Sequence, residues 1–316
     1  MTNFLLLIVG MTGLWLGSET LIRGAMSLAD RYRLSDALFG MLVLAIGTDL
    51  PELFVAFDAS FRSLAGEDLS GIVIGSALGS TIGQFALVFG VAGFIGYSPM
   101  QRKFLPRNAT FLIGGALALL IFSLDGVISR IEGGLLCLYY AAYVWVLIFG
   151  RGEVPESDEH GPHIDIWKAW LVLAIGFVLL LLAAKLTVES AASFATEMGM
   201  SNMAVSAIII GMGSSLPELS VSFVALLRKR GGLSIGNLVG SNVLDTLLVP
   251  GIAATISPLF VPAAVLWVDI PVLLLVTLLV LGFLYVSRRG IKSIEAAILL
   301  AIYAAYVAVR LTGPGS

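Results

Sequence analysis

Long apolar runs, separated by short polar segments, make up most of the chain. Each run is close to the roughly 20 residues that an α-helix needs to cross the hydrocarbon core of a bilayer. The pattern therefore predicts an all-α polytopic membrane protein with ten transmembrane helices. The predicted spans cover residues 3–25, 36–61, 70–98, 108–126, 130–150, 166–190, 202–227, 233–259, 262–287 and 292–311.

The composition agrees with this pattern and removes other classes. Of the 316 residues, 58% are hydrophobic and 12% are charged, whereas a soluble domain carries about 25% charged residues. The lipid bilayer is the expected partner, and neither nucleic acid nor an obligate protein partner is predicted. Cys137 is the only cysteine, so an intrachain disulfide is impossible. The first apolar run has no basic flank or cleavage signature, and we interpret it as a retained helix.

The two halves of the chain resemble each other in two blocks. At an offset of 166, residues 50–53 (LPEL) match residues 216–219 (LPEL). At an offset of 161, Gly79 and Ser80 match Gly240 and Ser241. Five spans are an odd number, so a second five-span copy must enter the membrane from the opposite side, as in many secondary transporters. We predict a first five-helix repeat at 1–150 (motif 45–90), a cytoplasmic linker at 151–165 and a second, inverted five-helix repeat at 166–316 (motif 211–251).

Basic residues predict the orientation of these spans. Fourteen of the 18 Lys and Arg residues fall at one end of the predicted bundle, for example Arg31 and Arg33 in the first loop and Arg228 to Arg230 in a later one. Loops rich in Lys and Arg stay in the cytoplasm. The chain is therefore expected to be a multi-pass protein of the cell membrane with both termini extracytoplasmic. Two acid–base pairs spaced four apart, Glu19 with Arg23 and Asp58 with Arg62, are interpreted as surface ion pairs.

A proline lies inside one predicted span of each half. Proline has no N–H and clashes with the carbonyl four residues earlier, so Pro51 and Pro217 should break their helices. The carbonyls of residues 45–47 and 211–213 are then expected to be free. Glu52 and Glu218 follow the two prolines directly. Ionisable residues at membrane depth are costly and usually mark an ion pathway.

Other oxygen-bearing side chains surround the two glutamates in the sequence. They are Thr48 and Asp49, Ser214 and Ser215, and, on the second block of each half, Ser80, Gln84, Ser241 and Asp245. Ser80 and Gln84 are four residues apart, as are Ser241 and Asp245, so each pair lies on one helical face. Carboxylate, hydroxyl and carbonyl oxygens suit Ca²⁺ or Na⁺, and the lack of His and Cys disfavours zinc and copper.

These blocks, GTDLPEL with GSALGSTIGQ and GSSLPEL with IGNLVGSNVLD, resemble the two alpha repeats of the cation/calcium exchanger superfamily, and in particular its sodium/calcium exchanger branch. The resemblance implies a secondary antiporter, not an enzyme, that exchanges Ca²⁺ for Na⁺ by alternating access and needs no cofactor. It implies that Glu52 and Glu218 are the central Ca²⁺ ligands. The other implied ligands are Thr48, Ser80, Ser214, Ser241, Asp245 and the carbonyls of Ala45 and Gly211.

Two residues depart from the family pattern. Asp49 stands where the family has Ser or Thr, and where the second repeat has Ser215. Gln84 stands where Asn or Asp is usual. A Ca²⁺/H⁺ or Na⁺/H⁺ antiporter, with Asp49 or Asp245 as the proton carrier, is therefore the alternative, and potassium dependence stays open. Asp49 could instead cap a neighbouring half-helix. A channel and an intramembrane protease are disfavoured, since no filter repeat, G-x-G-D setting or membrane-depth histidine is present.

Overall fold

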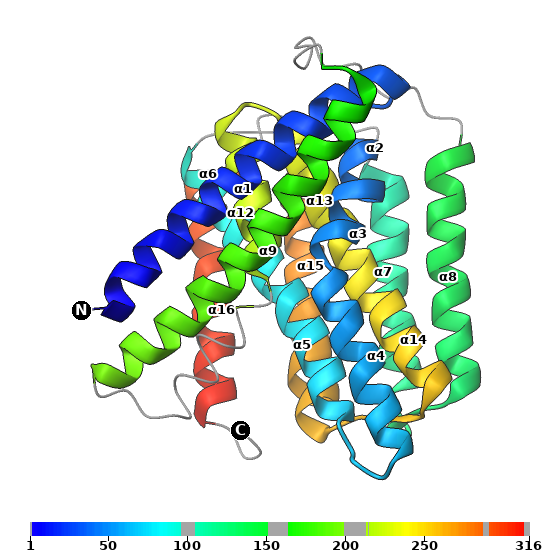
Figure 1. Cartoon of the computed structure of the whole chain (residues 1–316). Helices are drawn as coiled ribbons and strands as arrows, with labels where there is room; N and C mark the ends of the chain where they lie inside the picture. Colours follow the sequence, from blue (N-terminus) through cyan, green and yellow to red (C-terminus); the bar gives the residue numbers. More distant parts are fainter. Residues whose placement is uncertain are drawn as a thin grey trace.

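The computed structural model describes residues 2–95, 105–150, 164–198, 213, 215–286 and 291–312. Nearly all of these residues are helical (Figure 1), as expected where the backbone has no water to hydrogen-bond with. The helical elements are α1 (Thr2–Tyr32), α2 (Asp36–Phe39), the π-helical η1 (Gly40–Leu44), α3 (Ala45–Thr48), α4 (Leu50–Leu64), α5 (Ser70–Gly83), the π-helical η2 (Gln84–Val88), α6 (Phe89–Ile95), α7 (Leu105–Phe122), α8 (Arg130–Phe149), α9 (Ile166–Glu197), α12 (Leu216–Leu227), α13 (Gly231–Val243), the π-helical η5 (Leu244–Leu248), α14 (Val249–Ile256), the π-helical η6 (Val265–Asp269), α15 (Ile270–Val286) and α16 (Ser293–Thr312).

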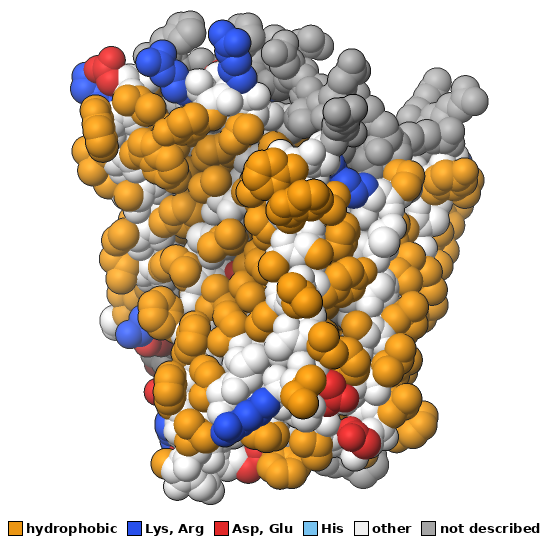
Figure 2. Space-filling model, turned by 90° about the vertical axis from the view of Figure 1, so that its right-hand side faces the viewer, with side chains coloured by type: hydrophobic (Ala, Val, Ile, Leu, Met, Phe, Trp, Pro, Cys, Tyr) orange, Lys and Arg blue, Asp and Glu red, His pale blue; other side chains and the backbone are white. Residues whose placement is uncertain are grey.

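The chain is a multi-span membrane protein. Within the described residues, seven helices are long and apolar enough to cross a bilayer, and the bent pair of Asp36–Thr48 with Leu50–Leu64 makes eight if it counts as one span. Two shorter apolar helices are Pro106–Phe122 and Leu216–Leu227. The count of ten stays a prediction, since part of the span predicted at 202–227 lies outside the described residues. Figure 2 shows hydrophobic side chains over the middle of one face, with charged side chains gathered toward its two ends.

A two-stranded sheet departs from the all-α expectation. The strands β1 (Val127–Ile128) and β2 (Leu259–Phe260) pair in antiparallel fashion, with Val127 opposite Phe260. They tie the turn between α7 and α8 to the turn that follows α14. The segments α13, η5 and α14 follow one another without a gap, and Arg230 lies just before their first residue. There, Arg230 Nη1 lies 3.5 Å from Asp36 Oδ2, and both side chains are nearly inaccessible. These two links show which connections share an end of the bundle.

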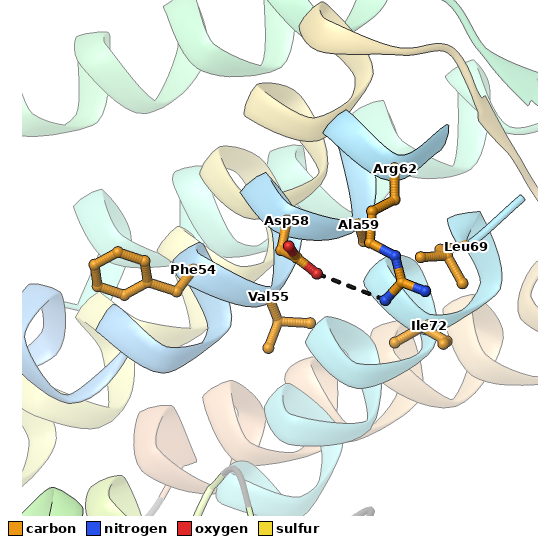
Figure 3. Close-up of a pocket in the computed structure, with 7 residues that line it drawn as sticks. All are labelled: Phe54, Val55, Asp58, Ala59, Arg62, Leu69 and Ile72. Carbon is orange, nitrogen blue, oxygen red and sulfur yellow. Dashed lines mark ion pairs between the residues drawn. The ribbon is translucent and has the colours of Figure 1, made fainter. Parts of the chain in front are cut away.

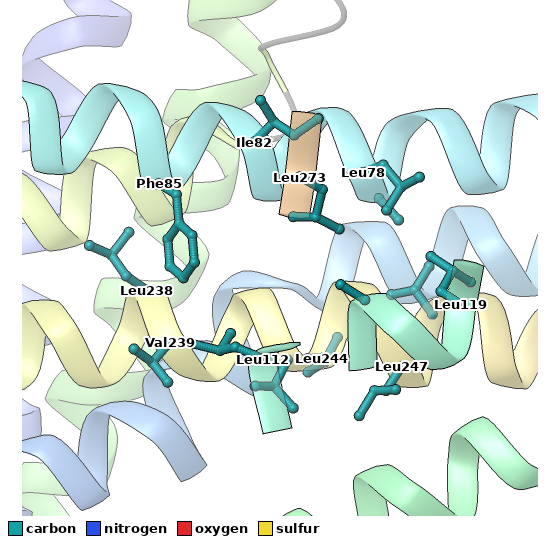
Figure 4. Packing of buried hydrophobic residues seen from close by; sticks show 14 of the residues in the cluster. Leu78, Ile82, Phe85, Leu112, Leu119, Leu238, Val239, Leu244, Leu247 and Leu273 are labelled. Atoms are coloured by element: carbon teal, nitrogen blue, oxygen red, sulfur yellow. The ribbon is translucent and has the colours of Figure 1, made fainter. Parts of the chain in front are cut away.

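The middle of the protein is formed by α5 with η2 and α13 with η5. Their apolar side chains interlock with those of α7 and α15 (Figure 4). Ile82 and Phe85 from the first half meet Leu238, Val239 and Leu244 from the second in this cluster. Close packing of this kind holds each side chain in one rotamer, so these two helices are a rigid frame for whatever polar groups they carry.

The long helices α1 and α9 form a separate pair that runs obliquely along the frame (Figure 1). Small residues let their backbones touch. A Cβ at Gly17 would lie 2.8 Å from the Leu180 amide nitrogen, and one at Gly24 would lie 2.7 Å from that of Leu173. Because the partner number falls as the α1 number rises, the two helices are antiparallel.

A shallow groove of about 340 Å³ lies on the surface beside α4 and the start of α5, and none of the buried acids described below lines it (Figure 3). It is apolar except for Asp58 and Arg62, which form the predicted exposed pair at 3.8 Å. Arg62 also pairs with Glu67. The predicted pair of Glu19 with Arg23 is also present, at 3.0 Å, and Glu19, which is 12% exposed, accepts from Arg228 as well.

Candidate cation-binding site

The first predicted helix break is present. Helix α3 ends at Thr48, α4 begins at Leu50 with Pro51 in its first turn, and the two segments are bent by 46°. The ring of Phe177, from α9, packs on Gly47 so closely that a Cβ there would lie 2.0 Å from it. The break thus brings Asp49 and Glu52 onto adjoining helix ends in the interior.

One part of that prediction is wrong. The carbonyl of Ala45 is not free, because it accepts the Asp49 amide at 3.0 Å and the Thr48 hydroxyl at 3.3 Å. The chain reaches Asp49 before it leaves the helical path, so the bond to residue 45 survives. Pro51 has no N–H to donate, so the carbonyl that loses its helical hydrogen bond is that of Gly47, two residues after Ala45.

The second break has matching local structure in the part that is described. Ser215 is the N-cap of α12, Pro217 lies in its first turn, and Glu218 follows. The backbone angles of Asp49 (φ −84°, ψ 4°) and Ser215 (φ −84°, ψ 0°) are nearly identical. The two other expected ligands of this segment, Gly211 and Ser214, lie outside the described residues.

Three carboxylates from the two halves meet at these breaks. Asp49, Glu52 and Glu218 each offer an oxygen that lies within 4.8 Å of the others, and all three side chains are buried. We call these three residues the carboxylate cluster. Neither oxygen of Asp49 or Glu218 accepts a hydrogen bond from any described residue. The expectation that Glu52 and Glu218 lie together is therefore confirmed.

Asp245 is a fourth buried acid in the same region. It lies in η5, is fully buried, and accepts no hydrogen bond from the described part of the chain. The charges of Asp49 and Glu52 are close enough to interact electrostatically with it. Its predicted neighbour on that helical face, Ser241, is also fully buried, and its hydroxyl has no hydrogen-bond partner among the described residues.

Neutral side chains beside the acids bond to one another. Gln84 donates its amide to Ser80 Oγ at 2.8 Å, as the four-residue spacing predicts. The same Ser80 oxygen accepts the Ser215 hydroxyl at 2.8 Å, and Gln84 Oε1 accepts the Asn242 amide at 3.0 Å. We call Ser80, Gln84, Ser215 and Asn242 the neutral network. It joins α5 and η2 of the first half to α12 and α13 of the second.

Asn237 is a buried polar residue that the sequence reasoning missed. Its amide donates to Ser222 at 3.1 Å and to the Glu218 carbonyl at 3.4 Å, and its Oδ1 accepts the Thr48 hydroxyl at 3.3 Å. A signal was available, because residues 237, 241 and 245 are polar and spaced by four, which places them on one face of the helix. Asn237 connects the two broken segments directly.

The two central helices change to π-helix at corresponding places. The segment η2 begins at Gln84, and η5 (Leu244–Leu248) contains Asp245, the residue 161 positions later. Single π-helical turns within α-helices are frequent at functional sites. The repeated sequence blocks thus correspond to a repeated local structure.

Buried acidic and neutral oxygens at broken helices define a class of membrane proteins that move ions. The sequence matches the profile of the family described as sodium/calcium exchanger protein over residues 2–149 and 168–312. The chain belongs to this family, which consists of antiport transporters rather than enzymes.

Individual relatives agree with this assignment. The putative antiporter CaxA of Alkalimonas amylolytica is 28% identical, with 95% of each chain covered. The sodium/calcium exchanger MaX1 of Methanosarcina acetivorans is 27% identical, with 97% of this chain and 98% of the relative covered. The solved structure of the sodium-calcium exchanger NCX_Mj is 26% identical, with 98% of each chain covered and a TM-score of 0.81. The similarity extends over essentially the whole chain.

Proposed function

We propose that this protein is a secondary antiporter that exchanges Ca²⁺ for Na⁺ across the cell membrane. The observation that carries the proposal is the meeting of Asp49, Glu52 and Glu218, from both halves of the chain, in one buried cluster. Three negative charges held this close in an apolar interior repel one another unless cations neutralise them. Cations are then the substrate that such a cluster requires.

The donor set favours hard cations. Ca²⁺ binds six to eight oxygens, from carboxylates, carbonyls and hydroxyl-bearing groups, at about 2.3–2.6 Å. Glu52 and Glu218 would be the central ligands, with Asp49, Asp245 and the hydroxyls of Thr48, Ser80, Ser215 and Ser241 around them. The carbonyl of Gly211 and the hydroxyl of Ser214 complete the proposed set. Na⁺ would compete for the same oxygens, which is the basis of exchange.

The proposed architecture is ten spans in two inverted five-helix halves, with both termini extracytoplasmic. Three observations support it. Helices α1 and α9, the first of each half, are antiparallel. The π-helical turns η2 and η5 overlap in corresponding positions of the two halves, with η5 starting one residue earlier. The β1–β2 pair joins two turns that the ten-span arrangement puts on the same side. Inverted halves supply two states of similar energy, which alternating access needs.

Uptake of calcium-45 into proteoliposomes tests the proposal. Vesicles loaded with Na⁺ should accumulate Ca²⁺ when diluted into Na⁺-free buffer, and vesicles without an ion gradient should not. Separate K⁺ and pH gradients identify the coupling ion. Uptake driven by a pH gradient alone, without Na⁺, would instead support the Ca²⁺/H⁺ alternative. Failure of every gradient to drive uptake would refute the proposal.

A further inference from the structure

The two helix breaks carry different side chains on the same backbone. Asp49 and Ser215 occupy corresponding positions, 166 residues apart, and their φ and ψ angles agree within a few degrees. Both side chains are buried. The difference between the two positions is therefore chemical, a carboxylate in one half and a hydroxyl in the other.

The surroundings use the two side chains differently. The hydroxyl of Ser215 donates to Ser80 and is part of the neutral network. Asp49 makes no capping hydrogen bond to α4, and neither of its oxygens accepts a hydrogen bond from the described part of the chain. The capping role considered for Asp49 thus has no contact to support it. Its oxygens face Glu52 and Glu218 instead.

We propose that Asp49 is a third carboxylate ligand of the transported cation and that its charge sets the preference of the site for divalent over monovalent cations. This inference rests on the proposed function, because it specifies the charge preference of the same site. The Coulomb energy between an ion and a carboxylate is proportional to the charge of the ion. At equal distance, Asp49 therefore stabilises Ca²⁺ twice as much in free energy as it stabilises Na⁺.

This doubling gives a quantitative expectation. A doubled free energy is a squared factor in the dissociation constant, so a tenfold loss of Na⁺ affinity should accompany about a hundredfold loss of Ca²⁺ affinity when the charge is removed. A residue that acts only by shape or packing would change the two affinities by unrelated factors. The relation between the two changes therefore separates charge from structure.

The experiment measures equilibrium binding of calcium-45 and of sodium-22, each alone, to the purified full chain. The variants are Asp49→Ser, which copies the second repeat, and Asp49→Asn, which keeps the shape and removes the charge. Asp58→Asn is the matched control, because it removes an exposed acid from α4, the helix that follows Asp49, at the surface groove. Thermal unfolding and gel filtration verify that each variant is folded.

We expect both Asp49 variants to lose Ca²⁺ affinity by about the square of their loss for Na⁺, and Asp58→Asn to change either affinity less than twofold. An unchanged ratio of Ca²⁺ to Na⁺ affinity in Asp49→Asn would overturn the inference. The inference would also be overturned if Asp49→Asn kept the full preference for Ca²⁺ over Na⁺ while Asp49→Ser lost it. The shape of the side chain, and not its charge, would then be responsible. Glu52→Gln distinguishes a failure of the inference about Asp49 from a failure of the proposed function. If Glu52→Gln also leaves Ca²⁺ binding intact, the proposed function itself fails.

Discussion

The carboxylate cluster and the neutral network lie in the same apolar interior, yet they differ in whether their polar atoms have hydrogen-bond partners. Every member of the neutral network, from Ser80 to Asn242, exchanges hydrogen bonds with other members. In the carboxylate cluster, the oxygens of Asp49 and Glu218 accept none from the described residues. A buried polar group costs free energy unless it is paired. Apart from Asn242 Oδ1, which accepts no hydrogen bond from the described residues, the network finds its partners within the protein, whereas the carboxylates of Asp49 and Glu218 need a ligand. The difference separates side chains that already have partners within the protein from carboxylates that need a ligand.

The largest expected effect comes from the glutamates. Glu52→Ala or Glu218→Ala should abolish Na⁺-driven Ca²⁺ uptake, because each removes a central charge that the cation needs. Calcium-45 uptake into proteoliposomes measures this, with the amount of folded protein in the vesicles as the control. Near-normal exchange in either variant would show that the cluster is not the binding site.

The next effect is stabilisation by the substrate. A ligand that binds only the folded state adds about 2.7 kcal/mol at a concentration of 100 times Kd. Calcium should therefore raise the melting temperature of the detergent-solubilised protein, and Glu218→Gln should lose this increase. Asn242→Ala, in the neutral network, should retain it. Equal increases in both variants would contradict the separation of roles.

Without cations, the melting temperatures of the same two variants should change in opposite directions. Asn242→Ala leaves Gln84 Oε1 without its donor, and an unsatisfied buried acceptor costs about 1–3 kcal/mol, so the melting temperature should fall. Glu218→Gln removes one of the mutually repelling charges, so the melting temperature in cation-free buffer should rise. Thermal unfolding in a calcium chelator and Na⁺-free buffer measures both. A fall in both variants would mean that the acids also stabilise the ligand-free fold.

The smallest effect belongs to the surface. The Asp58–Arg62 pair is exposed and lines the surface groove, which contains no member of either buried group. Exposed ion pairs contribute about 0–1 kcal/mol, so Arg62→Gln should change Ca²⁺ uptake less than twofold. A larger loss of uptake, measured in the same proteoliposomes, would extend the functional region to the outer end of α4.

The sequence predicts features that depend on spacing along one helix. The bend before Pro51 and the bond from Gln84 to Ser80 follow from local rules, and the pairing of Glu52 with Glu218 follows from the repeat. Contacts across the halves, such as Asn242 with Gln84 and Asn237 with Thr48, depend on how the helices cross, which no local pattern specifies. The occupied carbonyl of Ala45 shows the same limit, since a proline rule does not say how far the helix continues before it bends. The ligand roles, the repeat boundaries and the ten spans stay predictions.

The contact of Phe177 with Gly47 gives the outer pair of helices a mechanical influence on the interior. An aromatic ring from α9 fills the volume that any side chain at residue 47 would need. Residue 47 is two positions before Asp49, so a displacement of α9 would move the Phe177 ring away from the junction between α3 and α4. The angle of that junction, and with it the spacing of the acids, would then depend on where a helix at the edge of the molecule rests.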